Sequence, residues 1–217
     1  MPAPDELFAK YENAIGGAAA IDKLKTRVAE ATVKTPRGDM HASTWQEAPN
    51  KIVSELSLPN GQGQTTIYNG DKGWQKNGPR VQEINDVPDL ESLKLQANFF
   101  RDLRFKGQYT RAFTLRSTAT LDGHECYVVR GQLPGGMFSD TLYFDKDSGL
   151  LVRRVTSQRT PLGPLPQQTD FSDYRDVNGV KVPFLVKRYR GDQLFTSTIT
   201  KLAYNLPVEE TKFARPQ

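Results

Sequence analysis

The stretch 167-QQTDFSDYRDVNGVKVPFLVKRY-189 contains two segments joined by Asn178-Gly179. An Asn-Gly pair favours a tight hairpin turn, because both residues readily adopt positive φ. In the second segment the even-numbered residues from Val180 to Val186 are all apolar, which places them on one face of a strand. This hairpin therefore predicts an antiparallel sheet with one apolar face.

Similar segments of β-like composition, bounded by Gly, Pro, Asn or Asp, fill most of the chain. A second strong turn signal, Asp122-Gly123, joins two of them. We expect about eleven antiparallel strands. Thirteen segments are candidates for these strands. They are 27–35, 40–48, 51–58, 64–70, 73–78 and 80–84, followed by 112–121, 124–132, 137–145, 150–159, 167–177, 180–189 and 193–202.

Two parts of the chain have helical spacing instead. In the first, residues 1–26, apolar residues recur at helical intervals after Asp5, until Gly16-Gly17 ends the first helix. In the second, residues 88–104, Pro88 and Asp89 precede a broad apolar stripe. Because such a stripe must face an apolar surface, we expect this second helix to cover the apolar face of the sheet as a lid.

The bulk composition fits a single mainly β (α+β) domain over residues 1–217. The chain has 37% hydrophobic residues and a net charge of +4, which suits a sheet with one dry and one wet face. We divide it into N-terminal helices (1–26), a strand meander (27–84), a lid helix (88–104) and a hairpin series (112–205). No run of 18 apolar residues occurs, so we expect no membrane-spanning helix.

Candidate catalytic and metal-binding residues are few. His124 and Cys126 are two residues apart on a predicted strand, where an imidazole could lower the pKa of a thiol; a buried structural cysteine is the favoured interpretation. The acidic stretch 170-DFSDYRD-176 could offer oxygen ligands to calcium, but it lacks the EF-hand pattern. We expect no enzyme activity, no cofactor and no metal.

Basic residues cluster after the predicted lid helix, at Arg101, Arg104 and Arg111, with Phe105 and Tyr109 among them. Such a pattern could bind single-stranded nucleic acid. Solvated strand ends commonly carry the same residues, and that interpretation is favoured. We therefore expect no nucleic-acid partner, and keep the three arginines as candidates for contact with a membrane or an envelope protein.

Several phrases resemble the periplasmic lipoprotein-carrier superfamily (LolA/LolB-like), in particular its outer-membrane lipoprotein-sorting relatives. They are 11-YENAIGGAAAIDKLKT-26, 69-NGDKGW-74, 142-LYFDKDSGLLVRR-154, 170-DFSDYRDVNGVKVPF-184 and 207-PVEETKF-213. The resemblance covers nearly the whole chain. It implies an incomplete β-barrel of about eleven antiparallel strands, covered on its concave side by helices, with an apolar cavity for acyl chains.

The resemblance also implies a function, namely a non-enzymatic carrier or sensor for a lipoprotein acyl chain or other lipophilic ligand. We expect the cavity wall to consist of Trp45, Trp74, Leu90, Leu93, Ala97, Phe100, Leu142, Phe144 and Phe184. The most apolar loop, 161-PLGPLP-166, would bring Leu162 and Leu165 to a membrane or partner. We expect a monomer in the periplasm or cell envelope, with its leader outside this sequence, because residues 1–8 lack signal-peptide features.

An alternative stays open. In that case the fold is the same, but side chains fill the cavity, and the protein is an interaction module that docks an anionic partner or membrane through its basic surface. Trp74 bears on the choice: under the lid helix it would line an open cavity or help to fill it, whereas on an exposed loop it would serve recognition.

Overall fold

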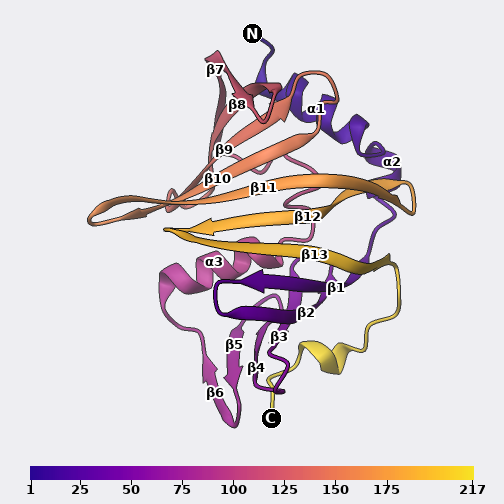
Figure 1. Ribbon diagram of the computed structural model, residues 1–217, viewed down its shortest axis with the longest axis vertical. Helices are drawn as coiled ribbons and strands as arrows, with labels where there is room; N and C mark the ends of the chain where they lie inside the picture. The colour runs from indigo at the N-terminus through magenta and orange to yellow at the C-terminus, as the bar shows by residue number, and fades with distance from the viewer. The chain divides into compact units, whose positions relative to one another are not determined.

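The computed structural model describes residues 1–217, except for the side chains of residues 116 and 117, and is mainly β (Figure 1). Helices are α1 (Pro4–Ala14), α2 (Ala18–Ile21), α3 (Val87–Ala97) and the 3-10 helix η1 (Glu210–Phe213). Strands are β1 (Thr26–Thr35), β2 (Gly38–Glu47), β3 (Lys51–Ser57), β4 (Gly63–Tyr68), β5 (Gly73–Asn77), β6 (Arg80–Glu83), β7 (Arg111–Leu121), β8 (His124–Gln132), β9 (Phe138–Asp145), β10 (Leu151–Thr160), β11 (Gly163–Val177), β12 (Val180–Arg190) and β13 (Gln193–Tyr204).

The mainly β class and the antiparallel pairing are confirmed, but the strands number thirteen, not about eleven. All thirteen candidate segments of the sequence form strands, including the two shortest, β5 and β6. These strands of five and four residues pair with each other in register, Trp74 opposite Glu83 and Asn77 opposite Arg80. A strand this short is stable because its neighbours supply the remaining hydrogen bonds.

The chain divides into two compact units. The first contains Met1–Ala19 and Leu103–Thr196, and the second contains Ala20–Asp102 and Ser197–Gln217. In the first unit the strand order is β12-β11-β10-β9-β8-β7, and in the second it is β6-β5-β4-β3-β2-β1-β13, with β13 starting among residues of the first. None of the described helices is long and apolar enough to cross a bilayer.

Turn chemistry explains the hairpins of the first unit. Asp122 and Gly123 have φ of 49° and 84°, and Asn178 and Gly179 have φ of 56° and 80°. These values suit two-residue turns whose twist matches that of the strands. Both predicted hairpins are confirmed, β7–β8 and β11–β12.

An aromatic cluster forms the core of the first unit beneath α1. The ring centroids of Phe8 and Phe105 are 5.7 Å apart, and those of Tyr11 and Phe144 are also 5.7 Å apart. Helix α1 ends at Ala14, before Gly16 as predicted. A β-carbon at position 16 would lie 2.1 Å from the carbonyl oxygen of Gly179, so glycine is required there. Helix α1 therefore covers one face of this unit, with Phe144 of β9 beneath it.

Candidate functional site

Helix α3 covers one face of β3, β4 and β5 in the second unit. Leu93 and Ala97 are buried against Ile52 of β3 and Tyr68 of β4, and the partly buried Leu90 lies at the margin of this contact. Three of the residues predicted for the cavity wall, Leu90, Leu93 and Ala97, therefore lie together on one side of the helix.

Gly73 of β5 lies directly beneath this side of α3. A β-carbon at position 73 would be 2.7 Å from Leu93 Cδ2 and 3.6 Å from Leu90 Cδ1. Carbon atoms in good contact stay about 3.5–4.0 Å apart, so glycine is the residue that fits without moving Leu93. Helix and sheet are in close contact here.

Packing, more than capping, holds α3 in place. Asp86 occupies the N-cap without forming a side-chain cap, and Val87 in the first turn is 59% exposed. At the other end Gln46 Nε2 donates to the carbonyl oxygen of Gln96 at 3.0 Å, and the Phe99 amide donates to the Pro49 carbonyl. Because an isolated helix of 11 residues is marginal in water, α3 depends on its apolar contact with the sheet.

Trp45 and Trp74, also predicted for the wall under the lid helix, lie on the opposite face of the same strands. Trp45 is opposite Val53, Val53 opposite Ile67, and Ile67 opposite Trp74 in the strand register. These residues pack with Phe213 of η1. Neighbouring residues of a strand point to opposite faces; because Gly73 faces α3, Trp74 faces η1, and its predicted place beside the lid is wrong.

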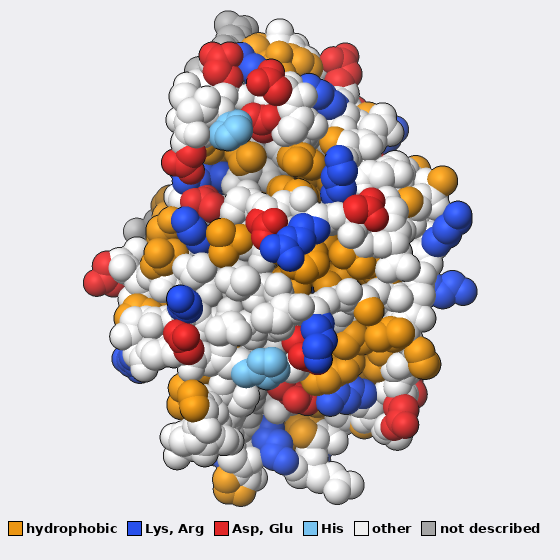
Figure 2. Space-filling model, turned by 45° about the vertical axis from the view of Figure 1, so that its right-hand side comes forward, with side chains coloured by type: hydrophobic (Ala, Val, Ile, Leu, Met, Phe, Trp, Pro, Cys, Tyr) orange, Lys and Arg blue, Asp and Glu red, His pale blue; other side chains and the backbone are white. Residues whose placement is uncertain are grey.

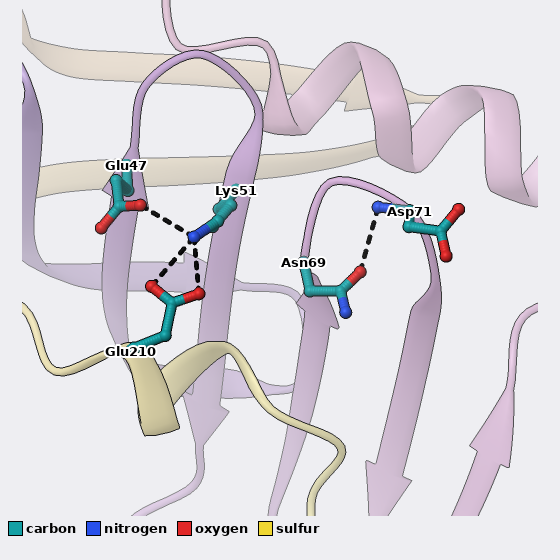
Figure 3. Close-up of polar contacts among 5 residues, drawn as sticks. All are labelled: Glu47, Lys51, Asn69, Asp71 and Glu210. Atoms are coloured by element: carbon teal, nitrogen blue, oxygen red, sulfur yellow. Dashed lines mark hydrogen bonds and ion pairs between the residues drawn. The ribbon is translucent and has the colours of Figure 1, made fainter.

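The C-terminal segment is fixed to this opposite face by ion pairs (Figure 3). Lys51 Nζ lies 2.7 Å from a carboxylate oxygen of Glu210 and 2.9 Å from one of Glu47. Hydrogen bonds to Glu210 and Glu47 raise the pKa of Lys51. Lys212 lies 3.7 Å from the centroid of the Trp45 ring, a cation–π contact. In the adjoining β4–β5 turn, Asn69 Oδ1 accepts from the Asp71 amide.

Phe100 lies outside the helix that was predicted to present it. Helix α3 ends at Ala97, not at 104, and Asn98 is extended. The Asn98 side chain accepts a hydrogen bond from the Phe100 amide at 3.1 Å. Asparagine favours such local bonds over helical ones, which accounts for the early end of the helix.

The three arginines predicted for partner contact differ in exposure. Arg101 is buried, at 9% exposed, so its predicted place on an exposed basic surface is wrong. Arg104 is partly buried and pairs with Glu12 at 3.4 Å, and Arg111 is exposed. On the face displayed in Figure 2, basic and acidic side chains are interspersed with apolar ones.

The remaining predicted wall residues, Leu142, Phe144 and Phe184, belong to the first unit, where all three are buried. Phe144 is part of the aromatic cluster beneath α1. The ring centroid of Phe184 of β12 lies 4.6 Å from the guanidinium carbon of Arg175. The predicted wall residues therefore lie in separate groups of contacts.

Two open pockets occur in the first unit. One, of about 290 Å³, lies between the start of α1 and β7, and its lining includes Phe8, Phe105 and Tyr109. The other, of about 310 Å³, lies near the β10–β11 turn, and its lining includes Met137, Phe138 and Arg159. Pockets that bind small molecules usually measure about 300–1,000 Å³, so both openings lie at the lower limit of this range.

The β10–β11 hairpin ends in an apolar tip and extends past the end of β12 at the left of Figure 1. Leu162 is 100% exposed and Leu165 is 61% exposed. Thr160 Oγ1 donates to the carbonyl oxygen of Gly163 at 2.7 Å, which closes the turn. The predicted loop is thus a tight turn that presents Leu162 to solvent.

His124 and Cys126 do not form a reactive pair. Cys126 is fully buried, and burial raises the pKa of its thiol. His124 Nδ1 lies instead 3.2 Å from a carboxylate oxygen of Asp145. This contact was not predicted from the sequence. It arises because Asp145 lies opposite Cys126 in the strand register, and His124 is on the same face of β8, two residues before Cys126.

The acidic stretch of β11 forms local contacts. Asp170 is bound by Arg153 with an Nη2–Oδ2 distance of 2.8 Å, and Asp173 by Arg175 at 2.6 Å. Asp176 accepts from the Gly179 amide. Among the described side chains, no group of His, Cys, Asp and Glu could hold a metal ion.

Searches with protein-family models and among curated proteins find no match for this sequence. Solved structures do match. A DUF1329 family protein from Desulfovibrio piger aligns over 97% of this chain and 96% of its own, with a TM-score of 0.65 and 14% identity. A LolA superfamily protein from Nitrosomonas europaea aligns over 95% and 96%, with a TM-score of 0.60 and 11% identity.

The chain has a LolA-like fold. An outer membrane lipoprotein-sorting protein domain from Vibrio parahaemolyticus is similar too, over 96% of this chain and 93% of its own, with a TM-score of 0.59 and 12% identity. The resemblance drawn from the sequence phrases is thereby confirmed at the level of the fold. Folds host many functions, so a function for this LolA-like chain must be argued from its own residues.

Proposed function

We propose that this protein is a non-enzymatic carrier or sensor in the periplasm or cell envelope, which binds an acyl chain or other lipophilic ligand beneath helix α3. One observation carries the proposal: a short helix without a side-chain N-cap rests by apolar contacts on an apolar sheet face. A ligand that replaces Leu90, Leu93 and Ala97 on that face would bury a comparable apolar surface. The LolA-like fold supports the same proposal.

The energetics of such an exchange are favourable enough to test. Each buried methylene of an acyl chain contributes about 0.8 kcal/mol. The ligand must offset the lost contacts of Leu93 and Ala97, which are almost fully buried, so a long chain is required. Helix α3 then acts as a lid, closed in the unliganded state.

Displacement of a fluorescent fatty acid tests this function. Leu90→Gln, at the margin of the contact, should tighten binding of the fatty acid by up to about tenfold, since it removes apolar contact worth about 1.4 kcal/mol from the closed state that the ligand displaces. Val87→Gln is the matched control, because Val87 lies on the same helix and is 59% exposed; it should leave binding unchanged. Hydrogen exchange should show faster exchange of the α3 amides when ligand is bound.

Binding without any change in α3 exchange would place the ligand elsewhere. If no lipophilic probe binds at all, the carrier function is wrong, and the alternative of a protein-interaction module with the same fold is favoured.

A carrier must also meet a membrane or a lipoprotein, and we propose the tip of the β10–β11 hairpin for this contact. Leu162 is fully exposed at its end, where inserted apolar side chains would gain contact with acyl chains. The double variant Leu162→Gln/Leu165→Gln should reduce co-flotation with phospholipid vesicles. Leu194→Gln is the control, at a 39% exposed leucine of β13. Equal flotation of all three proteins would contradict this contact.

A further inference from the structure

The pocket of about 310 Å³ near the β10–β11 turn brings hydrogen-bond donors together. Ser139 of β9 lies opposite Ser157 of β10 in the strand register, and both line the pocket. Arg159 also lines it, two residues beyond Ser157 and therefore on the same face of β10. The pocket thus collects one guanidinium and two hydroxyl groups, all of which can donate hydrogen bonds.

The face of the sheet around this pocket is positively charged. Two rows of directly opposed residues cross it from β7 to β11, and neither row contains a carboxylate. One row is Arg111, Gln132, Ser139, Ser157 and Pro166, and the other is Phe113, Arg130, Thr141, Val155 and Gln168. Arg111, Arg130 and Arg159 are all exposed. An anion that enters the pocket is therefore attracted by three cations and is not repelled by these rows.

A phosphate group matches the donors of the pocket. Its oxygens point in several directions, so they can accept hydrogen bonds from Arg159 and from hydroxyls on two neighbouring strands. A guanidinium also binds phosphate through two parallel hydrogen bonds, which fixes the orientation of the group. A volume at the lower limit for small-molecule pockets suits a head group of this size.

The pocket adjoins the apolar tip of the hairpin (Figure 1). Thr160 and Gly163 of the turn line the pocket, and Leu162 between them is 100% exposed. Arg159 precedes Leu162 by three residues, which span at most about 10 Å. The head-group layer on each side of a bilayer is about 5–7 Å thick. With Leu162 in the hydrocarbon, Arg159 would therefore lie level with the lipid phosphates.

We propose that this pocket binds the phosphate of a membrane phospholipid, and that the hairpin tip consequently prefers anionic bilayers. The inference rests on the membrane contact proposed above and names the lipid group that this contact recognises. Phosphatidylglycerol presents a phosphate without a neighbouring cation. Phosphatidylcholine places its choline cation beside the phosphate, where the arginines repel it.

Co-sedimentation with two kinds of vesicle tests the inference on the unaltered protein. One kind contains phosphatidylcholine alone, and the other contains equal parts of phosphatidylcholine and phosphatidylglycerol. We expect partition into the second kind to be at least about fivefold stronger, the effect of one arginine at an anionic surface. Equal partition into both would overturn the inference and leave the apolar tip contact intact. Failure to bind either kind would overturn the proposed membrane contact as well.

Two variants assign the preference to the pocket. Arg159→Gln should lower partition into the phosphatidylglycerol vesicles about fivefold. Ser157→Ala removes one donor and should lower it about threefold. Arg80→Gln, at an exposed arginine of β6, makes the same change in charge and is the control. An Arg159→Gln variant that loses no more partition than Arg80→Gln would overturn the assignment to this pocket, as would a Ser157→Ala variant that partitions normally.

Inorganic phosphate distinguishes a lipid head group from a soluble ligand. It has no acyl chains beside which Leu162 could insert, so at millimolar concentration it should release no more protein from the vesicles than sodium chloride of equal ionic strength does. Release by phosphate but not by sodium chloride would show that the pocket takes a soluble phosphate, and would overturn the assignment to a lipid.

Discussion

Gly73 and Leu93 are in direct contact across the α3–sheet interface, with Leu93 Cδ2 2.7 Å from where a β-carbon of residue 73 would lie. A substitution at this contact should change the stability of the closed state and the affinity for ligand in opposite directions. Gly73→Ala should lower the free energy of unfolding by about 1–3 kcal/mol, the usual cost of overpacking. It should also tighten binding of a fluorescent fatty acid, because it destabilises the closed state that ligand displaces.

Urea denaturation and probe titration measure the two effects of Gly73→Ala. In the double variant Gly73→Ala/Leu93→Ala the clash is gone, so the two substitutions should be less than additive in stability. A Gly73→Ala variant that is less stable and also binds the probe more weakly would contradict the role of α3 as a lid.

Tryptophan fluorescence should show whether the C-terminal segment shields Trp45 and Trp74 from water. The chain has two tryptophans, and both contact the cluster around Phe213. Phe213→Ala should lower the free energy of unfolding by about 3 kcal/mol and shift tryptophan emission to longer wavelength, as water reaches Trp74. Phe113→Ala, at an exposed phenylalanine of β7, should do neither. Unchanged emission in Phe213→Ala would show that the segment does not shield the rings.

Acid stability should depend on Asp145. Burial raises the pKa of this carboxyl, but hydrogen bonds from the Ser148 side chain and backbone, together with His124, hold it below its ordinary value of 3.8. A depressed pKa stabilises the fold above the unfolded-state value and ceases to do so as the pH falls through the folded-state pKa. Ser148→Ala should therefore cost about 1 kcal/mol at pH 7, and this difference should shrink below pH 3.8.

Thermal denaturation of Ser148→Ala between pH 2 and pH 7 measures this dependence, with Ser172→Ala, at an exposed serine of β11, as the control. A stability difference that is constant across this range would show that the Ser148 contact does not act through the charge of Asp145.

Local chemistry made much of this fold predictable from the sequence. Asp122-Gly123 and Asn178-Gly179 favour positive φ by residue type alone, and both hairpins formed where these pairs occur. Alternation in β12 likewise predicted a buried face, and Val180 and Val182 are buried as expected. These features depend on residues close together in the chain.

Features that depend on distant residues were not predictable in the same way. The face on which Trp74 lies is decided by register, and a shift of one residue would exchange the faces. The cover on that face, around Phe213, comes from a segment distant in sequence and without strand or helix periodicity. Gln46 and Arg27 likewise come to lie opposite each other only once β1 and β2 are paired.

Strand β5 places Gly73 and Trp74 next to each other, one beneath α3 and the other beneath the C-terminal segment. Because neighbouring residues of a strand point to opposite faces, α3 and the C-terminal segment contact different positions of β5. Substitutions at odd-numbered positions of β5 can alter how firmly α3 is seated while the tryptophan side remains intact. The two faces of the strands can therefore be altered separately, because neighbouring positions of β5 contact different covers.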